Sequence, residues 1–398
     1  MPLSPRSRPA GSRHRLILAV IPLLIACGVD SPDAPNGIAP RAAQLDRGSA
    51  HSIRNVSPSG SDVGTCIGSP CKTISYAVSQ SAAGDVISVG HGTYHESVQV
   101  TKRLALVGHD ATIDAAGQSS PPNGVVIVGP SAAGTSLTGF TVQNAGLEGI
   151  FVDHTTGIEV ADNTVVHNDA YGPNNPLCVD QPDDCGEAIH LQTVTNSVVR
   201  NNLVKDNVGG ILLTDEEGPT YGNLIVDNRV LDNTLDCGIT LASHHFNLTT
   251  AATADVAGVY RNTVLHNTSN GNGAAGIGVF AGPPGASAWE NVVIGNTAMH
   301  NGFAGIMIHS HTPAQYVNDN VITNNTLAFN GIDDDNPFDT TPTGISIFSA
   351  VIPIQRTVVA ANSISNQHDG INAVKAVRLL GLPSNKFAGS VQVPVVIH

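Results

Sequence analysis

The sequence predicts an all-β fold, a right-handed parallel β-helix, and three observations support this. A β phrase flanked by Asn recurs along the chain, and a second phrase beginning with Gly-Ile or a similar pair follows each copy. The copies lie 22 to 39 residues apart, long enough for a coil of two or three short strands. Only 4% of the residues are aromatic, 13% are charged and 41 are Gly, which argues against a helical bundle.

The two phrases define the expected coils. The Asn-flanked phrases are NTVVHN (163–168), NLVKDN (202–207), NRVLDN (228–233), NTVLHN (262–267), NTAMHN (296–301), NTLAFN (325–330) and NSISN (362–366). The Gly-Ile phrases are GIFV (149), AIHL (188), GILL (210), GITL (238), GIGV (276), GIMI (305), GISI (344) and GINA (370). We expect Ile and the residue two positions later to point inward, and the alternate positions to face solvent. Asn tolerates a left-handed turn, and its amide can bond to the Asn of the next coil.

The N-terminal part of the repeat region is expected to form a cap. Residues 51–125 read as a strand, a loop closed by cysteines, a helix over about Lys72 to Ala82, and further strands. Apolar Ile74, Ala77 and Val78 lie on one face of this helix. A helix there covers the open apolar end of the first coil.

The cap and the repeats also resemble a known family. The stretch SPSGSD…PCKTISYAV resembles the start of bacterial pectin-lyase-like β-helix proteins, and the repeated phrases resemble those of carbohydrate-binding and sugar-hydrolysis β-helices. The resemblance covers residues 51 to about 375, and residues 126–398 would be coils and a C-terminal cap. It implies a parallel β-helix with a polysaccharide partner and says little about the reaction.

The N-terminus reads as an export signal. Residues 1–26 combine four arginines with the apolar run LILAVIPLLIA, as in a secretory signal peptide. LIAC resembles the bacterial lipobox, which implies cleavage before Cys27 and acylation of its thiol; an ordinary signal peptide that contains Cys is the alternative. Residues 27–50 would be a flexible tether. We therefore expect an exported, membrane-anchored lipoprotein at the cell surface or in the periplasm.

Charge limits the partners of the exported chain. Removing the four arginines changes the net charge from −14 to −18. Such a surface repels nucleic acid and anionic lipid, so we expect no nucleic-acid partner and membrane contact only through the anchor. No segment after residue 50 approaches the roughly 18 apolar residues of a membrane span.

Cysteine spacing agrees with export. Cys66 and Cys71 lie five residues apart, Cys178 and Cys185 seven apart, and turn residues flank each pair. We expect two local disulfides, as is usual outside the cytosol. Cys237 remains, and we expect a buried, inert thiol.

Aligning the coils on the Gly-Ile phrase gathers titratable side chains on one wall. The gathered residues are Asp215, Glu216, Glu217, His244, His245, His309 and His311. Adjacent coils lie about 4.8 Å apart, so Glu216 and His244 should be neighbours. His311 would lie two coils further along, and His190 one coil before Asp215.

Carboxylates beside imidazoles suit proton transfer near neutral pH, because the carboxylate tunes the imidazole pKa. Asp215, Glu216, His244 and His309 are the catalytic candidates. The candidates for substrate contact are His190, Glu217, Tyr221, His245, His311 and Phe280. The same residue types also suit a divalent metal. The structural alternative is that these histidines are ordinary solvated side chains, as we expect for His167, His266 and His300.

Two acidic insertions, residues 178–190 and 331–344, separate an Asn phrase from its Gly-Ile phrase. Both are expected to project from one edge of the coils. Their oxygen-rich side chains could bind Ca²⁺ or another divalent metal, with Asp180, Asp183 and Asp184 as ligands. There is no EF-hand spacing, so solvated acidic loops remain the alternative.

The phrase DDCGEAI resembles the catalytic phrase of polygalacturonase-type β-helix hydrolases, which implies Asp183 and Asp184 as acid and base. This chain departs from that pattern by one extra residue before Ala188, and by the lack of Gly-His-Gly in the next coil and of Arg-Ile-Lys beyond it. Pectate-lyase chemistry uses an Arg or Lys as the base beside Ca²⁺. The gathered residues include neither Arg nor Lys, so they do not resemble that type of site.

The residues therefore favour a polysaccharide lyase or C5-epimerase with a His base and Tyr221 as a possible acid. Metal-assisted cleavage is a variant of this hypothesis. The alternative from another class is a surface glycan-binding or structural β-helix without turnover, in which the same side chains only hydrogen-bond a sugar.

Overall fold

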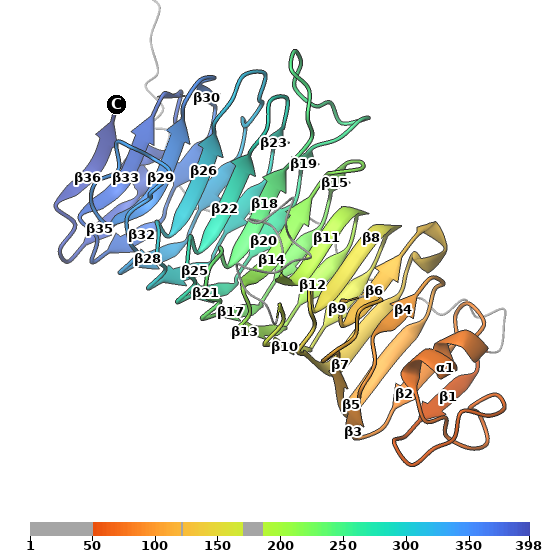
Figure 1. The fold of residues 1–398 in the computed structure, drawn as a ribbon. Helices are drawn as coiled ribbons and strands as arrows, with labels where there is room; N and C mark the ends of the chain where they lie inside the picture. Colours follow the sequence, from red (N-terminus) through yellow and green to blue (C-terminus); the bar gives the residue numbers. More distant parts are fainter. Residues whose placement is uncertain (1–50, 121, 170–185) are drawn as a thin grey trace, which may run out of the picture. The chain divides into compact units, whose positions relative to one another are not determined.

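The computed structural model describes residues 51–120, 122–169 and 186–398, and it confirms the predicted parallel β-helix. The named strands pair in parallel, each with the strand one coil away (Figure 1). No helix in the described part of the chain is long and apolar enough to cross a membrane. Several predicted features lie outside the described residues: the signal peptide, Cys27, the tether, the Cys178–Cys185 disulfide and the candidate ligands Asp180, Asp183 and Asp184.

Two columns of short strands form the 20-stranded sheet, called sheet A. The first column is β1 (Ile53–Val56), β2 (Val86–Val89), β5 (Ala105–Asp114), β7 (Ser136–Gln143), β9 (Glu159–Ala161), β12 (Val198–Arg200), β16 (Leu224–Val226), β20 (Thr263–Leu265), β24 (Val292–Ile294), β27 (Val321–Thr323) and β31 (Val358–Ala360). The second is β3 (Gly92–Tyr94), β10 (Thr164–Val166), β13 (Leu203–Lys205), β17 (Arg229–Leu231), β21 (Thr268–Asn270), β25 (Thr297–Met299), β28 (Thr326–Ala328), β32 (Ser363–Ser365) and β35 (Lys386–Ala388). The long strands β5 and β7 pair in both columns and join them.

The 14-stranded sheet, called sheet B, forms another wall and carries the Gly-Ile phrases. Its main column is β4 (Val98–Val100), β6 (Val125–Val128), β8 (Ile150–Thr156), β11 (Glu187–Thr195), β14 (Gly209–Thr214), β18 (Ile239–Ser243), β22 (Ile277–Ala281), β26 (Ile306–Ser310), β29 (Thr343–Ser349), β33 (Asp369–Val374) and β36 (Val393–Ile397). A side column is β15 (Thr220–Tyr221), β19 (Val259–Tyr260) and β23 (Ala288–Trp289). The remaining elements are β30 (Ile354–Gln355), β34 (Ala376–Val377), and the 3₁₀ helices η1 (Pro130–Ala132) and η3 (Leu382–Ser384).

The core consists of inward-pointing aliphatic side chains stacked from coil to coil. In sheet B, Ile189 pairs with Ile211, Ile211 with Ile239, and Ile239 with Ile277. All four are fully buried. Each buried Ile contributes about 1.5–3 kcal/mol relative to an exposed side chain, and only the neighbouring coils can bury it. The inward pattern predicted from the Gly-Ile phrases is therefore confirmed.

Buried asparagines form ladders along the coil corners, as the Asn phrases predict. One ladder is Asn163, Asn202, Asn228, Asn267, Asn296, Asn325, Asn362 and Asn385. In each step the amide of one Asn donates to the side-chain oxygen of the next, at 2.9–3.1 Å. That oxygen also accepts the backbone N–H of the first Asn, so each residue satisfies buried groups of two coils.

The left-handed turns differ from the expectation. Asn163 and the other asparagines of its ladder do not adopt left-handed backbone angles. The residue just before an Asn of the repeated phrases often adopts them instead, as Asp162 (φ 57°) and Asp227 (φ 55°) do. The predicted surface histidines His167 and His266 occupy such turn positions. The ladder Asn must present its amide along the coil axis, so its neighbour makes the turn.

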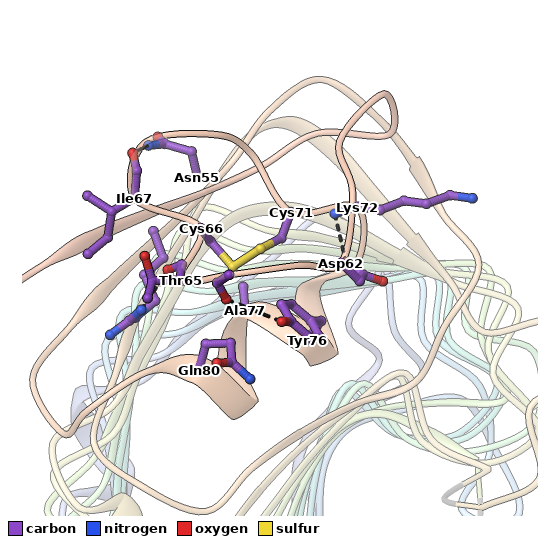
Figure 2. The surroundings of a disulfide bond; sticks show 12 residues. Asn55, Asp62, Thr65, Cys66, Ile67, Cys71, Lys72, Tyr76, Ala77 and Gln80 are labelled. Atoms are coloured by element: carbon purple, nitrogen blue, oxygen red, sulfur yellow. Dashed lines mark hydrogen bonds between the residues drawn. A yellow bond between two sulfur atoms is a disulfide. The ribbon is translucent and has the colours of Figure 1, made fainter.

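The N-terminal cap matches the prediction closely. Helix α1 (Ile74–Gln80) is a little shorter than expected at both ends, and Thr73 caps it by accepting the N–H of Tyr76. The predicted apolar face of the helix is buried. The Cys66–Cys71 disulfide is present and lies beside α1 (Figure 2). The phenol of Tyr76 donates to the carbonyl of Gly64, which joins the helix to the disulfide loop.

Asn228→Ala should lower the free energy of unfolding by about 2–4 kcal/mol. The substitution removes the acceptor of the Asn202 N–H and the donor to the Val199 carbonyl, and both partners are buried. Chemical denaturation followed by far-UV circular dichroism measures the loss. Asn324→Gly is the matched control, because Asn324 is exposed with φ 56° and Gly accepts that conformation. Equal stability of the two variants would contradict a structural role for the ladder.

The cap should also be acid-labile. Asp85 is buried, and burial works to raise its pKa, but N–H groups of Ser52 and Ala82 and the guanidinium of Arg54 (2.7 Å) outweigh burial and lower it. Because the pKa of Asp85 is lowered on folding, the ionised carboxylate stabilises the fold at pH values above its ordinary pKa of 3.8. This stabilisation is lost as the pH falls through the pKa of the folded state. Asp85→Asn should remove that pH dependence and cost about 3–5 kcal/mol at neutral pH. Hydrogen exchange of cap amides tests this, with exposed Asp110→Asn expected to match the wild type.

Candidate functional site

The predicted polar residues lie on or beside the outer side of sheet B, but they form two clusters rather than one. The first contains Glu216 and His244, which follow strands β14 and β18. The second contains His309 and His311, at the end of β26 two coils further along. We call them the Glu216 cluster and the His309 cluster. Residues at the β22 level, including Phe280, lie between them in the strand register.

Glu216 and His244 form the hydrogen-bonded pair that the coil spacing predicts. Nδ1 of His244 lies 2.7 Å from a carboxylate oxygen of Glu216. The two side chains are 17–18% exposed, so the pair is shielded from bulk water and still reachable from solvent. The contact joins residues 28 positions apart because β14 and β18 pair directly.

Asp215 is not exposed beside Glu216 as the sequence suggested. Its side chain is fully buried and accepts three hydrogen bonds: from the hydroxyl of Ser243 (2.8 Å) and from the backbone N–H groups of His244 (2.6 Å) and Gly258 (2.5 Å). Burial raises the pKa of Asp215 despite these bonds. Asp215 therefore fixes the backbone of His244, as a positioning residue inside the wall.

Electrostatics hold Glu216 in its ionised form. Burial works to raise its pKa, but the hydrogen bond and charge of His244 outweigh burial and lower the pKa to about 2. The charge of His190 acts in the same direction. An ionised carboxylate at Nδ1 fixes the orientation of the imidazole.

His190 extends the Glu216 cluster by one coil. Its Nε2 lies 2.8 Å from the hydroxyl of Thr214, and its Nδ1 lies 3.6 Å from the Glu148 carboxylate, beyond hydrogen-bond range. Among the described residues, Nδ1 of His190 and Oε2 of Glu216 are buried without a hydrogen-bond partner. An unpaired buried polar atom costs about 1–3 kcal/mol, so a water molecule or ligand bonded to these two atoms would stabilise the cluster.

Three further residues complete the Glu216 cluster at its exposed edge. His154 lies with Nδ1 2.5 Å from Asp153 and Nε2 3.1 Å from Glu217. Burial raises the pKa of Asp153, although His154 opposes the shift. Glu217 was predicted, whereas Asp153 and His154 were not singled out, although the phrase DHTT stands at the equivalent place in its coil.

The second acidic insertion folds onto sheet B and does not project as expected. Asp333 is fully buried and lies 2.8 Å from Nε2 of His309, which is also fully buried. Asp339 bonds to Thr343 at 2.8 Å; burial raises its pKa to about 6. The prediction that alternate strand positions face solvent is wrong here, because residues just before the strands pack over the outer face, as Ala274 and Ala304 do at Met307.

Around His309 the wall is partly aromatic. Phe280 and Phe348 flank its ring edge to face, at centroid distances of 5.4 and 5.6 Å. The ring of His311 lies 5.2 Å from that of His309. Burial lowers the pKa of His311, and the nearby His309 adds to the effect. Phe280 thus packs against a buried histidine.

The other predicted residues lie apart from both clusters. Tyr221 stacks on Tyr260 at 4.9 Å, and Tyr260 stacks on Trp289 at 4.4 Å, along the side column of sheet B. A recurring aromatic-X-Asn pattern, as in Tyr221 before Asn223, is a signal for this stack that sequence reasoning missed. His245 is partly exposed next to His244. Cys237 is buried as predicted, and burial raises the pKa of its thiol.

Residues 123–327, more than half of the chain, match the family described as the right handed beta helix region. The chain belongs to the right-handed β-helix family. Among curated protein sequences none matches it significantly.

Two solved structures are similar to this β-helix protein. The A-module of the mannuronan C-5 epimerase AlgE4 of Azotobacter vinelandii has a TM-score of 0.53 and 12% identity, over 79% of this chain and 89% of that chain. The Dettilon tailspike protein has a TM-score of 0.50 and 14% identity, over 81% of this chain and 63% of that chain. At such low identity the likeness establishes the fold alone.

Replacing His244 should reverse the pKa shift of Glu216. In the wild type, the ionised carboxylate of Glu216 stabilises the folded state at pH values above its ordinary pKa of 4.5. This contribution to the free energy of unfolding is lost as the pH falls towards the folded pKa of about 2. In His244→Ala the raising effect of burial remains, so the pKa of Glu216 should move above 4.5. Carboxyl ¹³C NMR of Glu-labelled protein measures this, and His245→Ala should leave the wild-type titration unchanged. A low pKa in both variants would show that another group holds the charge.

Proposed function

We propose that this β-helix protein acts on an acidic polysaccharide by proton abstraction next to the sugar carboxylate, as a lyase or a C5-epimerase. The observation that carries the proposal is the Glu216–His244 pair: an ionised, shielded carboxylate bonded at 2.7 Å to a partly exposed imidazole. In this pair Glu216 orients His244 as the general base.

The chemistry follows from the pair. His244 takes the proton from the sugar carbon that bears the carboxylate, and the electron pair moves into that carboxylate. The rising charge on the imidazole is stabilised by Glu216, which is already ionised. In a lyase the bond to the neighbouring glycosidic oxygen then breaks, that oxygen takes a proton from water or from the protonated His244, and an unsaturated sugar is left. In an epimerase a proton returns to the opposite face.

Two neighbouring histidines extend the pair. The partly exposed His154, beside Glu217, can meet a sugar carboxylate or hydroxyl, whereas the buried His190 is held by the hydroxyl of Thr214. Within the described part of the chain, Nδ1 of His190 and Oε2 of Glu216 are buried without a hydrogen-bond partner. The predicted lipid anchor and export signal fit a polymer substrate, which cannot enter the cell. The mannuronan epimerase named above supports this reading only through the shared fold.

Turnover can be tested on a panel of uronate and neutral polysaccharides. Unsaturated products absorb in the ultraviolet, reducing ends report hydrolysis, and NMR in deuterated water reports solvent deuterium entering the sugar during epimerisation. Glu216→Gln and His244→Ala should each lower the rate by about 100-fold or more. His109→Ala, on an exposed part of sheet A, should keep wild-type activity.

Other outcomes separate the competing hypotheses. Reducing ends without unsaturation would favour the hydrolase reading, with Asp183 and Asp184 as the residues to replace. Retention of a glycan without turnover, unchanged in His244→Ala, would favour a surface glycan-binding protein. Either result would overturn the proton-abstraction proposal.

A further inference from the structure

We propose that His309, His311 and Asp335 form a binding site for a divalent transition metal, for which Zn²⁺ is the natural occupant. This site is separate from the Glu216–His244 pair and does not depend on the proposed polysaccharide chemistry. His309 and His311 come from β26 and the residues just after it, and Asp335 comes from the acidic insertion that folds over this strand.

The geometry fits a small ion. One potential ligand atom from each of the three residues lies within 4.8 Å of the other two. Ligand bonds of about 2.0–2.1 Å in a tetrahedral zinc site place ligand atoms roughly 3.3 Å apart. The required contraction is modest, and Asp335 is exposed and His311 only partly buried, so both can move towards an ion.

The second observation is the state of His309. Its side chain is fully buried, and its Nε2 lies 2.8 Å from the carboxylate of Asp333. A carboxylate accepts hydrogen bonds, so this contact places the ring proton on Nε2 and leaves a lone pair on Nδ1. Among the described residues Nδ1 has no hydrogen-bond partner, although it is buried. A buried imidazole with one nitrogen held by carboxylate and the other unpaired is the arrangement of a metal-ligating histidine.

Asp333 is itself held in place for this role. The hydroxyl of Ser346 donates to its Oδ2 at 2.5 Å, and the backbone N–H of Asp335 donates to its Oδ1 at 3.2 Å. The second of these bonds also fixes the chain at Asp335, the proposed third ligand. Phe280 and Phe348 pack against the His309 ring and limit its rotation. The orienting partners of a metal ligand are therefore present before any ion binds.

The ligand set indicates which metals fit. Two imidazole nitrogens and one carboxylate oxygen suit Zn²⁺ and its first-row neighbours, whereas Ca²⁺ takes six to eight oxygen ligands. Three protein ligands leave a fourth position for water, which can reach the site because Asp335 is exposed. Ca²⁺ at this site is disfavoured by its two nitrogen ligands.

Metal titration of the purified full-length protein tests the inference. After treatment with a chelator and dialysis, Zn²⁺ should bind with one equivalent per chain by calorimetry, and Co²⁺ should give the visible absorption of a tetrahedral site. Asp333→Asn should weaken Zn²⁺ binding by about 10- to 100-fold, because it removes the orienting carboxylate. His311→Ala and Asp335→Asn, which remove ligands, should weaken it at least as much.

Controls separate the site from general affinity for metal. Asp334→Asn removes an exposed carboxylate from the same loop and should bind Zn²⁺ like the wild type. His309→Ala removes a buried side chain, so its folding is checked by circular dichroism, and the partly exposed His311 and Asp335 decide the result if it fails to fold. Failure to bind Zn²⁺, or binding that His311→Ala and Asp335→Asn leave intact, would overturn the proposal. No glycan is needed, so the outcome is independent of the proposed function.

Discussion

Fixed register between stacked coils is the constraint on which the rest of this structure depends. The Asn ladders enforce it, because each buried amide satisfies groups of the coils on both sides and a shift by one residue would leave them unpaired. Register then determines which side chains meet. Glu216 and His244 are 28 residues apart in sequence and touch because their strands are neighbours. Insertions can lengthen the corners between strands without disturbing this alignment.

Much of the fold could be predicted because its signals are periodic. The Gly-Ile phrases predicted which strand faces point inward. The apolar spacing in the cap predicted the buried side of the helix, which is formed by Ile74, Ala77 and Val78. The Glu216–His244 contact followed from the spacing of parallel strands alone. The roles of Asp215 and Asp333 did not follow from the repeats. Asp215 is held inside the wall by Ser243, His244 and Gly258, and Asp333 belongs to an insertion that folds onto sheet B. Such loops have no period, and a one-dimensional pattern does not place them.

The two polar clusters differ in the way their charge is stabilised. In the Glu216 cluster an ionised carboxylate and a partly exposed imidazole remain in contact with solvent, which suits a group that exchanges protons. In the His309 cluster the imidazole and its carboxylate are both fully buried and lie 2.8 Å apart, so each fixes the orientation of the other. The proposed proton transfer rests on the first arrangement and the proposed metal site on the second. Both lie on one wall, separated by the β22 level in the strand register.

The aromatic stack on the side column contains a fluorescent residue that can report on the unfolding of nearby coils. Trp289 is the only tryptophan of the chain, and it lies between Tyr260 and Tyr316 in the middle coils. The fluorescence emission of Trp289 therefore changes when those coils separate and does not report unfolding at either end of the chain. The terminal coils of a repeat protein can unfold before its central coils. A fluorescence transition that follows the loss of the far-UV circular dichroism signal would therefore show that unfolding starts at the termini.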